Sequence, residues 1–196
     1  MPRPRLLVLT AALGLALATG ACSTQEDPTA SVEVSSSAEE QLLAEHGLEG
    51  LSAQEIVEEL DRSPQPRPLS LGASVQADQL LLMDEDTEMT LALPDDVFYL
   101  SVAPYVSSTH DCYNHSLATC QGELAEEQIQ VTITDDSGEV LVDEEVTTYT
   151  NGFAGFWLPR GTSGTVEVDH EGRSGTAGFS TDVGDPTCMT TLQLSA

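Results

Sequence analysis

The pattern of apolar and polar residues changes twice along the chain and divides it into three parts. A continuous apolar stretch occupies residues 6–18. Between residues 37 and 60 the apolar residues recur at helical spacing, and from residue 74 onward short apolar or alternating runs follow one another. This order predicts an α+β protein, in which a short N-terminal helical element precedes an antiparallel β-sandwich.

Two short helices are predicted in the helical part. Ser37 with Glu40, and Ser52 with Glu55, each have the spacing of a capping box, and Gly47 is a suitable stop for the first helix. Helices of about ten residues are marginal alone, so this pair must pack on something. The simple interpretation is that they cap the following domain, and the functional alternative is that they pair two copies of the chain in a homodimer.

Three prolines, at positions 64, 66 and 68, end the helical pattern. Residues 37–70 are therefore predicted to form the helical or dimerisation element together with a proline-rich linker. Residues 71–196 are predicted to form the sandwich, because seven to nine short strands separated by turns are typical of that fold. The predicted strands are residues 75–83, 89–93, 97–106, 129–134, 140–149, 153–158, 165–170, 175–181 and 189–194.

The N-terminal residues indicate export. Arg3 and Arg5 precede an apolar stretch that has the length of a signal-peptide core and is too short to span a membrane. Gly20 and Ala21 are small residues of the kind that precede a lipidated cysteine, here Cys22. Ordinary cleavage at the same place, which would release a secreted protein, is the alternative.

This interpretation divides the N-terminal region. Residues 1–21 are predicted to be a signal peptide, and residues 22–36 a flexible tether that is anchored by lipid on the outer face of the cell membrane, on the periplasmic or cell-wall side. The tether is predicted from its lack of an apolar period and its many Ser, Thr, Asp and Glu residues.

The charge of the chain excludes two classes of partner. Without residues 1–21, 33 acidic residues stand against four arginines, a formal charge of −29, and the chain has no lysine. Such a field repels nucleic acid and anionic lipid headgroups, so we expect no nucleic-acid binding and no membrane contact except through the lipid anchor.

The cysteines and histidines carry the candidate chemistry. Once Cys22 is assigned to the lipid, an odd set remains, which is Cys112, Cys120 and Cys188. In an oxidising compartment the simplest outcome is a Cys112–Cys120 disulfide with Cys188 buried and inert. The alternative is a metal site. His110 and His115 lie in the same predicted loop as the first two cysteines.

The types of donor select a soft metal. Thiolates favour Cu(I) and zinc, and Cu(I) accepts two or three of them without a further ligand. Structural zinc normally takes four ligands, and the seven residues between Cys112 and Cys120 are not the spacing of a zinc knuckle. Copper is therefore the first candidate, and zinc is the second, with His115 completing its ligands.

Other functions use the same thiols. If Cu(II) reached Cys112 and Cys120, it could be reduced as they formed a disulfide, with Cys188 as a spare ligand or resolving thiol. A thiol-disulfide redox protein that binds metal only incidentally is a second interpretation. A surface interaction module stapled by a disulfide is a third.

Several segments resemble the CueP family of periplasmic copper-binding proteins. The resemblance begins near His46 and covers nearly all of the chain after the tether. The segments that carry it are FYLSVAPYV at 98–106, HDCYNHSL at 110–117, CQGEL at 120–124, VTITDD at 131–136, NGF at 151–153, WLPRG at 157–161 and PTC at 186–188.

The resemblance implies that Cys112, Cys120 and Cys188 bind copper outside the cytoplasm. From their place in the same loop, we expect His115 and His110 to assist binding or to guide entry of the metal. The resemblance further implies copper resistance, a two-domain dimer and supply of copper to an extracytoplasmic cuproprotein such as a superoxide dismutase. We therefore expect a protein that sequesters copper without enzymatic turnover. The acidity, the missing lysine and the lipid anchor depart from the well-known members of the family.

Overall fold

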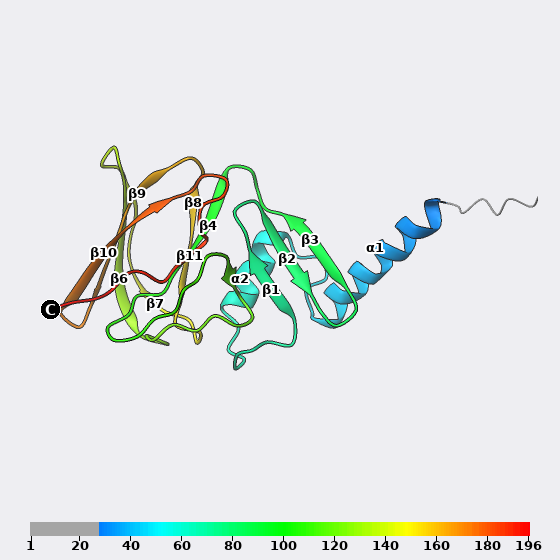
Figure 1. Cartoon of the computed structure of the whole chain (residues 1–196), viewed down its shortest axis with the longest axis horizontal. Coiled ribbons are helices and arrows are strands. Elements are labelled where there is room, and N and C mark those ends of the chain that lie inside the picture. Colours follow the sequence, from blue (N-terminus) through cyan, green and yellow to red (C-terminus); the bar gives the residue numbers. More distant parts are fainter. Residues whose placement is uncertain (1–27) are drawn as a thin grey trace, which may run out of the picture.

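The computed structural model describes residues 28–196, in which two helices precede a set of β-strands (Figure 1). The helices are α1 (Pro28–Glu45) and α2 (Ala53–Asp61). The strands are β1 (Gly72–Val75), β2 (Gln79–Met83), β3 (Glu88–Ala92), β4 (Val97–Val102), β5 (His115–Ser116), β6 (Gln128–Asp135), β7 (Val140–Thr147), β8 (Ala154–Pro159), β9 (Ser163–His170), β10 (Arg173–Ser180) and β11 (Cys188–Met189). The predicted α+β class is confirmed.

The two helices differ in how well the sequence predicts their bounds. The Ser52–Glu55 capping box is present at the start of α2. α1 ends at Glu45, and Gly47 follows with a φ of +71°, the left-handed conformation that stops a helix. Its start, however, is at Pro28 rather than at Ser37, so the predicted tether overlaps the first turns of α1. Proline suits a first helical position because no N–H is needed there.

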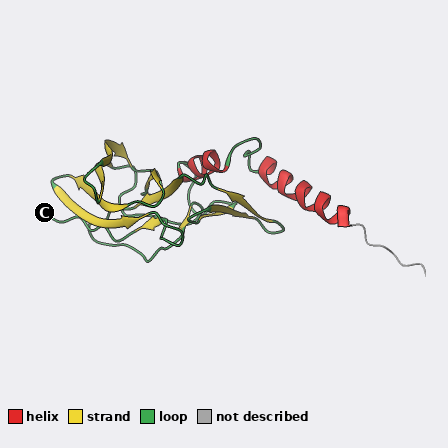
Figure 2. Ribbon diagram, turned by 90° about the horizontal axis from the view of Figure 1, so that it is seen from above, coloured by secondary structure: helices red, strands yellow, loops and turns green. Residues whose placement is uncertain are grey.

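α1 projects from the body of the molecule in both views (Figures 1 and 2). Only its C-terminal turns reach the rest of the chain, where Leu42 is buried. No helix in the part of the chain described here is long and apolar enough to cross a membrane. The signal peptide and the lipidated Cys22 lie outside the described residues, and both stay predictions.

Three of the predicted strands differ in the structure, and one of them, predicted at residues 97–106, ends as β4 at Val102. The apolar run at residues 75–83 is a hairpin, β1 and β2, because the chain turns at residues 76–78 and the Gln76 N–H donates to the Gln79 carbonyl at 2.8 Å. The last predicted strand, at residues 189–194, shortens to β11 and one isolated bridge at Gln193. The short strand β5 was not predicted. The leucines at 80–82 made the whole stretch of residues 75–83 resemble one strand, although the turn that precedes them contains the polar residues Gln76 and Asp78.

The strands form three sheets. Their orders are β3-β2-β1-β5, β10-β9-β6-β7 and β11-β4-β8. All pairs are antiparallel except β11 with β4, which is parallel. One apolar core lies between the sheet of β6, β7, β9 and β10 and one face of β4 and β8, which is the predicted sandwich. A second core joins the helices and β1–β3 to the other face of β4 and β8.

The sheet of β4 and β8 is thus covered on both faces, and it separates the two cores. Phe98 and Leu100 of β4 face the sandwich core, whereas Tyr99, between them, belongs to the helical core. Tyr99 pairs with Trp157 of β8, and the ring centroids are 4.7 Å apart. A Cβ on the nearby Gly155 would overlap the Tyr99 hydroxyl, so glycine at this position makes room for the phenol. The phenol then reaches α2, and this contact leads to the candidate site.

Candidate metal centre

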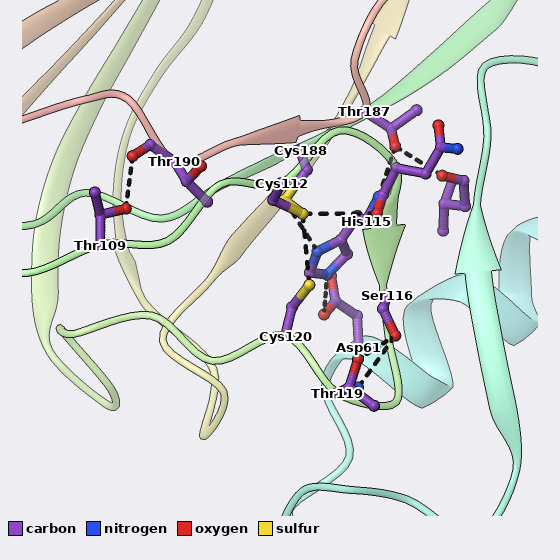
Figure 3. Close-up of a disulfide and its surroundings, with 12 residues drawn as sticks. Asp61, Thr109, Cys112, His115, Ser116, Thr119, Cys120, Thr187, Cys188 and Thr190 are labelled. Atoms are coloured by element: carbon purple, nitrogen blue, oxygen red, sulfur yellow. Dashed lines mark hydrogen bonds and ion pairs between the residues drawn. A yellow bond between two sulfur atoms is a disulfide. The ribbon is translucent and has the colours of Figure 1, made fainter.

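Four potential metal donors meet where the two cores adjoin. The ligand atoms of Cys112, His115, Cys120 and Cys188 all lie within 4.8 Å of one another (Figure 3). The first three come from the long connection between β4 and β6, and the fourth opens β11. Cys188 belongs to a small apolar cluster with Phe153, and Cys112 and Cys120 pack against this cluster. Residues separated by 76 positions in the sequence therefore share one site.

The late cysteine is brought to the loop by pairing of the backbone. β11 lies parallel to β4, with Cys188 opposite Ser101. The Thr187 hydroxyl accepts from the His115 N–H at 2.9 Å and donates to the Val75 carbonyl at 2.7 Å. The Cys188 N–H donates to the Tyr113 carbonyl at 3.2 Å. These bonds fix the segment that carries Cys188 against the loop.

The cysteines are paired differently from the simplest outcome that the sequence offered. Among the described residues, a disulfide joins Cys112 to Cys188 and Cys120 is a free thiol, which contradicts the alternative of a Cys112–Cys120 disulfide with an inert Cys188. The Cys120 Sγ lies 3.5 Å from the Cys112 Sγ. Sequence spacing favoured the local pair, whereas the fold places all three sulfurs together. Whichever two cysteines form a disulfide, the third thiol lies close enough to attack it in thiol–disulfide exchange.

His115 is fully buried between the sulfurs and a carboxylate. Its Nδ1 lies 3.7 Å from the Cys188 Sγ, and its Nε2 lies 3.0 Å from the Asp61 Oδ1. The imidazole packs on the Phe153 ring, with 4.4 Å between the ring centroids. Each ring nitrogen therefore faces a different group, sulfur on one side and oxygen on the other.

The Asp61 carboxylate is also fully buried, and other hydrogen bonds support it. The Tyr99 hydroxyl donates to its Oδ2 at 2.6 Å, and the Asn151 amide donates to its Oδ1 at 2.7 Å. Burial alone would raise the pKa of Asp61, but the charge of His115 and these hydrogen bonds lower it below its ordinary value. The carboxylate is therefore ionised at neutral pH.

The pKa of His115 shifts in the opposite direction. Burial alone would lower it, but the charge of Asp61 and hydrogen bonds to Asp61 and Cys120 raise the pKa from 6.5 to about 9. Asp61 and His115 thus form a buried ion pair in the metal-free protein at neutral pH.

His110 lies beside the cluster and not within it. Its ring is 6.3 Å from that of Phe153, and its Nε2 is buried without a hydrogen-bond partner among the described residues. It lines a cavity of about 400 Å³ together with Cys112 and Cys120. The prediction that His110 guides entry fits this position, whereas the structure does not group it with the four donors.

A second cavity also borders the disulfide. This cavity of about 420 Å³ is mostly apolar, and Cys112 and Cys188 form part of its wall. Leu100, Phe179 and Met189 contribute apolar lining. Cys112 thus borders two cavities.

The sequence did not indicate three residues of this site. Asp61 binds His115, and Tyr99 and Asn151 in turn bind Asp61. Each of the three lies in a segment to which the sequence assigned only a structural role. Asp61 is one of many acids, and it ends a helix. The only available signal was an acid placed among the apolar positions of α2, next to Leu60, since a charged residue on a buried face needs a partner.

The donor set fits a soft metal. Three sulfurs and one imidazole nitrogen are the ligands of Cu(I) and zinc sites, although the Cys112–Cys188 disulfide must be reduced before all three sulfurs act as thiolates. The fold and the site therefore define an α+β protein with a cysteine and histidine cluster that can hold metal.

The comparisons with known proteins agree. Residues 55–193 match the family described as "Periplasmic copper-binding protein CueP". A crystal structure of S.CueP is 44% identical, with a TM-score of 0.78, and the match covers 80% of this chain and 97% of that one. No curated protein matches the chain. The chain belongs to the CueP family, which is a family of periplasmic copper-binding proteins, and this confirms the resemblance and supports export.

The buried ion pair predicts how stability depends on pH. Because folding raises the pKa of His115 from 6.5 to about 9, the pair contributes fully below about pH 6.5, and the contribution is lost as the pH rises through 9. The lowered pKa of Asp61 sets the acid limit, where the contribution is lost as the carboxyl protonates. We expect urea titrations of the oxidised wild type to give a free energy of unfolding that falls as the pH rises from about 6.5 to 9. The free energy of unfolding of Asp61→Asn should change less over the same pH range.

Asp95→Asn is the matched control, because it removes one carboxylate from an exposed position. Its pH profile should follow that of the wild type. Parallel profiles for the wild type and Asp61→Asn would contradict the ion pair.

Proposed function

We propose that this protein is an exported lipoprotein that sequesters Cu(I) through Cys112, Cys120 and Cys188 and contributes to copper resistance. The observation that carries the proposal is the meeting of these three sulfurs with His115 within 4.8 Å, in a chain of a copper-binding family. Zinc is the second candidate metal. The protein handles its metal as cargo and performs no enzymatic turnover.

The chemistry of the donors supports Cu(I) over harder ions. Thiolates are soft ligands, and the cluster is lined by apolar groups such as Ala103 and Phe153. A low-polarity lining disfavours strongly hydrated ions. The acidic surface attracts cations generally, but screening over about 8 Å at physiological salt leaves the choice of metal to the sulfurs.

Copper titration of single cysteine variants tests this function. The starting protein carries Cys22→Ser, so that only the three clustered cysteines remain, and it is fully reduced and kept anaerobic. We expect one Cu(I) per chain by competition with a chromophoric chelator. We expect Cys112→Ser, Cys120→Ser and Cys188→Ser each to weaken binding by more than roughly 100-fold, which exceeds the usual cost of removing an outer partner of a ligand.

Cys22→Ser itself is the matched control, since it removes a cysteine outside the cluster. It should bind Cu(I) as tightly as the reduced wild type. If Cys188→Ser kept full affinity while Cys112 and Cys120 still exchanged disulfides, the thiol-disulfide redox function would be favoured instead. If neither the wild type nor any variant bound copper, the interpretation as a surface interaction module would be favoured.

Reduction of Cu(II) by the same thiols is a second proposed step. The observation that favours it is the Cys112–Cys188 disulfide, which shows where two of the sulfurs pair when oxidised. Forming that bond from two thiols releases two protons and two electrons, and these electrons reduce two Cu(II) ions to Cu(I). Only Cys120 and His115 then remain as donors, so one molecule either reduces copper or holds it with three sulfurs.

Counting thiols before and after anaerobic addition of Cu(II) checks this step. We expect the reduced Cys22→Ser protein to lose two thiols, and peptide mapping to find Cys112 joined to Cys188. Under the same conditions Cys188→Ser should pair Cys112 with Cys120, whose sulfurs already lie 3.5 Å apart. An unchanged thiol count would rule the reduction out.

Anchoring, assembly and delivery complete the proposal. Lipid attachment at Cys22 is supported by the small residues before it, and it places the protein on the outer face of the membrane. A homodimer formed through residues 37–70 and delivery of copper to a cuproprotein such as a superoxide dismutase follow from the resemblance to the family.

A further inference from the structure

The last residue of α2 lies directly behind the metal cluster. Asp61 belongs to the N-terminal helical element, which the sequence assigned to capping or dimerisation. Its carboxylate nevertheless contacts His115 of the loop, Tyr99 of β4 and Asn151, which precedes β8. Both Asp61 and His115 have no exposed surface. An ion pair this deeply buried requires close partners on every side, and these contacts provide them.

The contact decides which ring nitrogen faces the sulfurs. The His115 Nε2 is 3.0 Å from the Asp61 Oδ1, so the opposite nitrogen, Nδ1, is directed at the Cys188 Sγ, 3.7 Å away. A ring flip would separate the N–H from the carboxylate, and the Phe153 ring, 4.4 Å from the imidazole by centroids, restricts the space. A histidine that binds metal commonly donates its other N–H to a carboxylate in this way.

The carboxylate itself is held in place. The phenol of Tyr99 binds one oxygen and the Asn151 amide the other. Gly155 leaves room for the phenol, and Gly152, at a φ of +81°, allows the chain beyond Asn151 to approach Gly122 closely. The backbone around the carboxylate is therefore built to keep its two donors in position.

We propose that Asp61 is a positioning residue for the metal centre, which holds the His115 ring so that Nδ1 is a fourth donor beside the three sulfurs. The proposal rests on the metal-binding function proposed above. Metal that binds at Nδ1 displaces the proton there to solvent, whereas the Nε2–H stays with Asp61. The N-terminal element thus supplies a part of the copper-binding domain's site.

The two candidate metals use the fourth donor differently. Cu(I) is satisfied by three thiolates, whereas structural zinc takes four ligands in a tetrahedron. Loss of the Asp61 carboxylate should therefore weaken zinc binding much more than Cu(I) binding. A role that is only structural would disturb the whole cluster, and both metals would bind more weakly.

Metal competition with Asp61→Asn tests the proposal. The variant keeps the size of the side chain and removes its charge, and the reduced Cys22→Ser protein is the background. We expect Zn(II) affinity to fall by roughly 10- to 100-fold, the usual cost of losing such a partner, and Cu(I) affinity to change by less than about threefold. Asp95→Asn, an exposed carboxylate with the same charge change, should leave both affinities unaltered.

Two results would overturn the proposal. Equal losses for both metals would make Asp61 structural, and unaltered affinities would show that it does not act on the site. A parent protein that binds neither metal would instead refute the proposed function, so the two failures are distinguishable.

A measurement on the unsubstituted side chain covers the case in which Asp61→Asn does not fold. The ¹⁵N NMR signals of the His115 ring are compared in the reduced protein with and without Zn(II). We expect the Nδ1 signal to shift on metal binding, while Nε2 keeps its hydrogen and its coupling to it. A shift at Nε2 with loss of that hydrogen, or no shift at either nitrogen, would overturn the proposal.

Discussion

Two backbone hydrogen bonds hold the C-terminal segment along β4, and the site depends on them. The Ser101 N–H donates to the Thr187 carbonyl, and the Ala103 N–H donates to the Met189 carbonyl, both at 2.9 Å. This parallel pairing places Cys188 beside a loop that precedes it by about seventy residues, and a sulfur from near the end of the chain joins two from its middle. Parallel pairing needs a long connection, which here is the whole of β5 to β10. The cluster therefore exists only in the completed fold.

The ion pair of Asp61 and His115 connects this sulfur cluster to the helical core. Burying two charges costs several kcal/mol per ion unless each is paired and hydrogen-bonded, and removing one partner of such a pair costs about 3–5 kcal/mol. Here Tyr99, Asn151 and the two charges meet that requirement together. The ion pair fixes the His115 imidazole beside the three sulfurs. This is why we assign the helical element a part in metal handling in addition to its role in packing.

The sequence predicted what depends on local pattern and failed where distant segments meet. The capping box at Ser52, the stop at Gly47 and the alternation in β6 are local, and the structure confirms them. The turn inside residues 75–83 was missed because Val75 and the leucines at 80–82 suggested one apolar strand, although Gln76, Asp78 and Gln79 between them are polar. The Cys112–Cys188 disulfide was missed because spacing favours near pairs. Asp61 was missed because, among 33 acids, only its place next to Leu60 distinguished it. The three cysteines themselves could be named in advance, since their odd number and the resemblance to a copper-binding family pointed to them.

The oxidised and the metal-binding forms of the site exclude one another at Cys112 and Cys188, so the central claim is that all three sulfurs converge on one ion once reduced. X-ray absorption at the copper edge of the reduced, Cu(I)-loaded protein tests this claim most directly. Our account predicts a first shell dominated by three sulfur scatterers, which falls to two in Cys188→Ser. A shell of nitrogen and oxygen, or one that Cys188→Ser leaves unchanged, would contradict it.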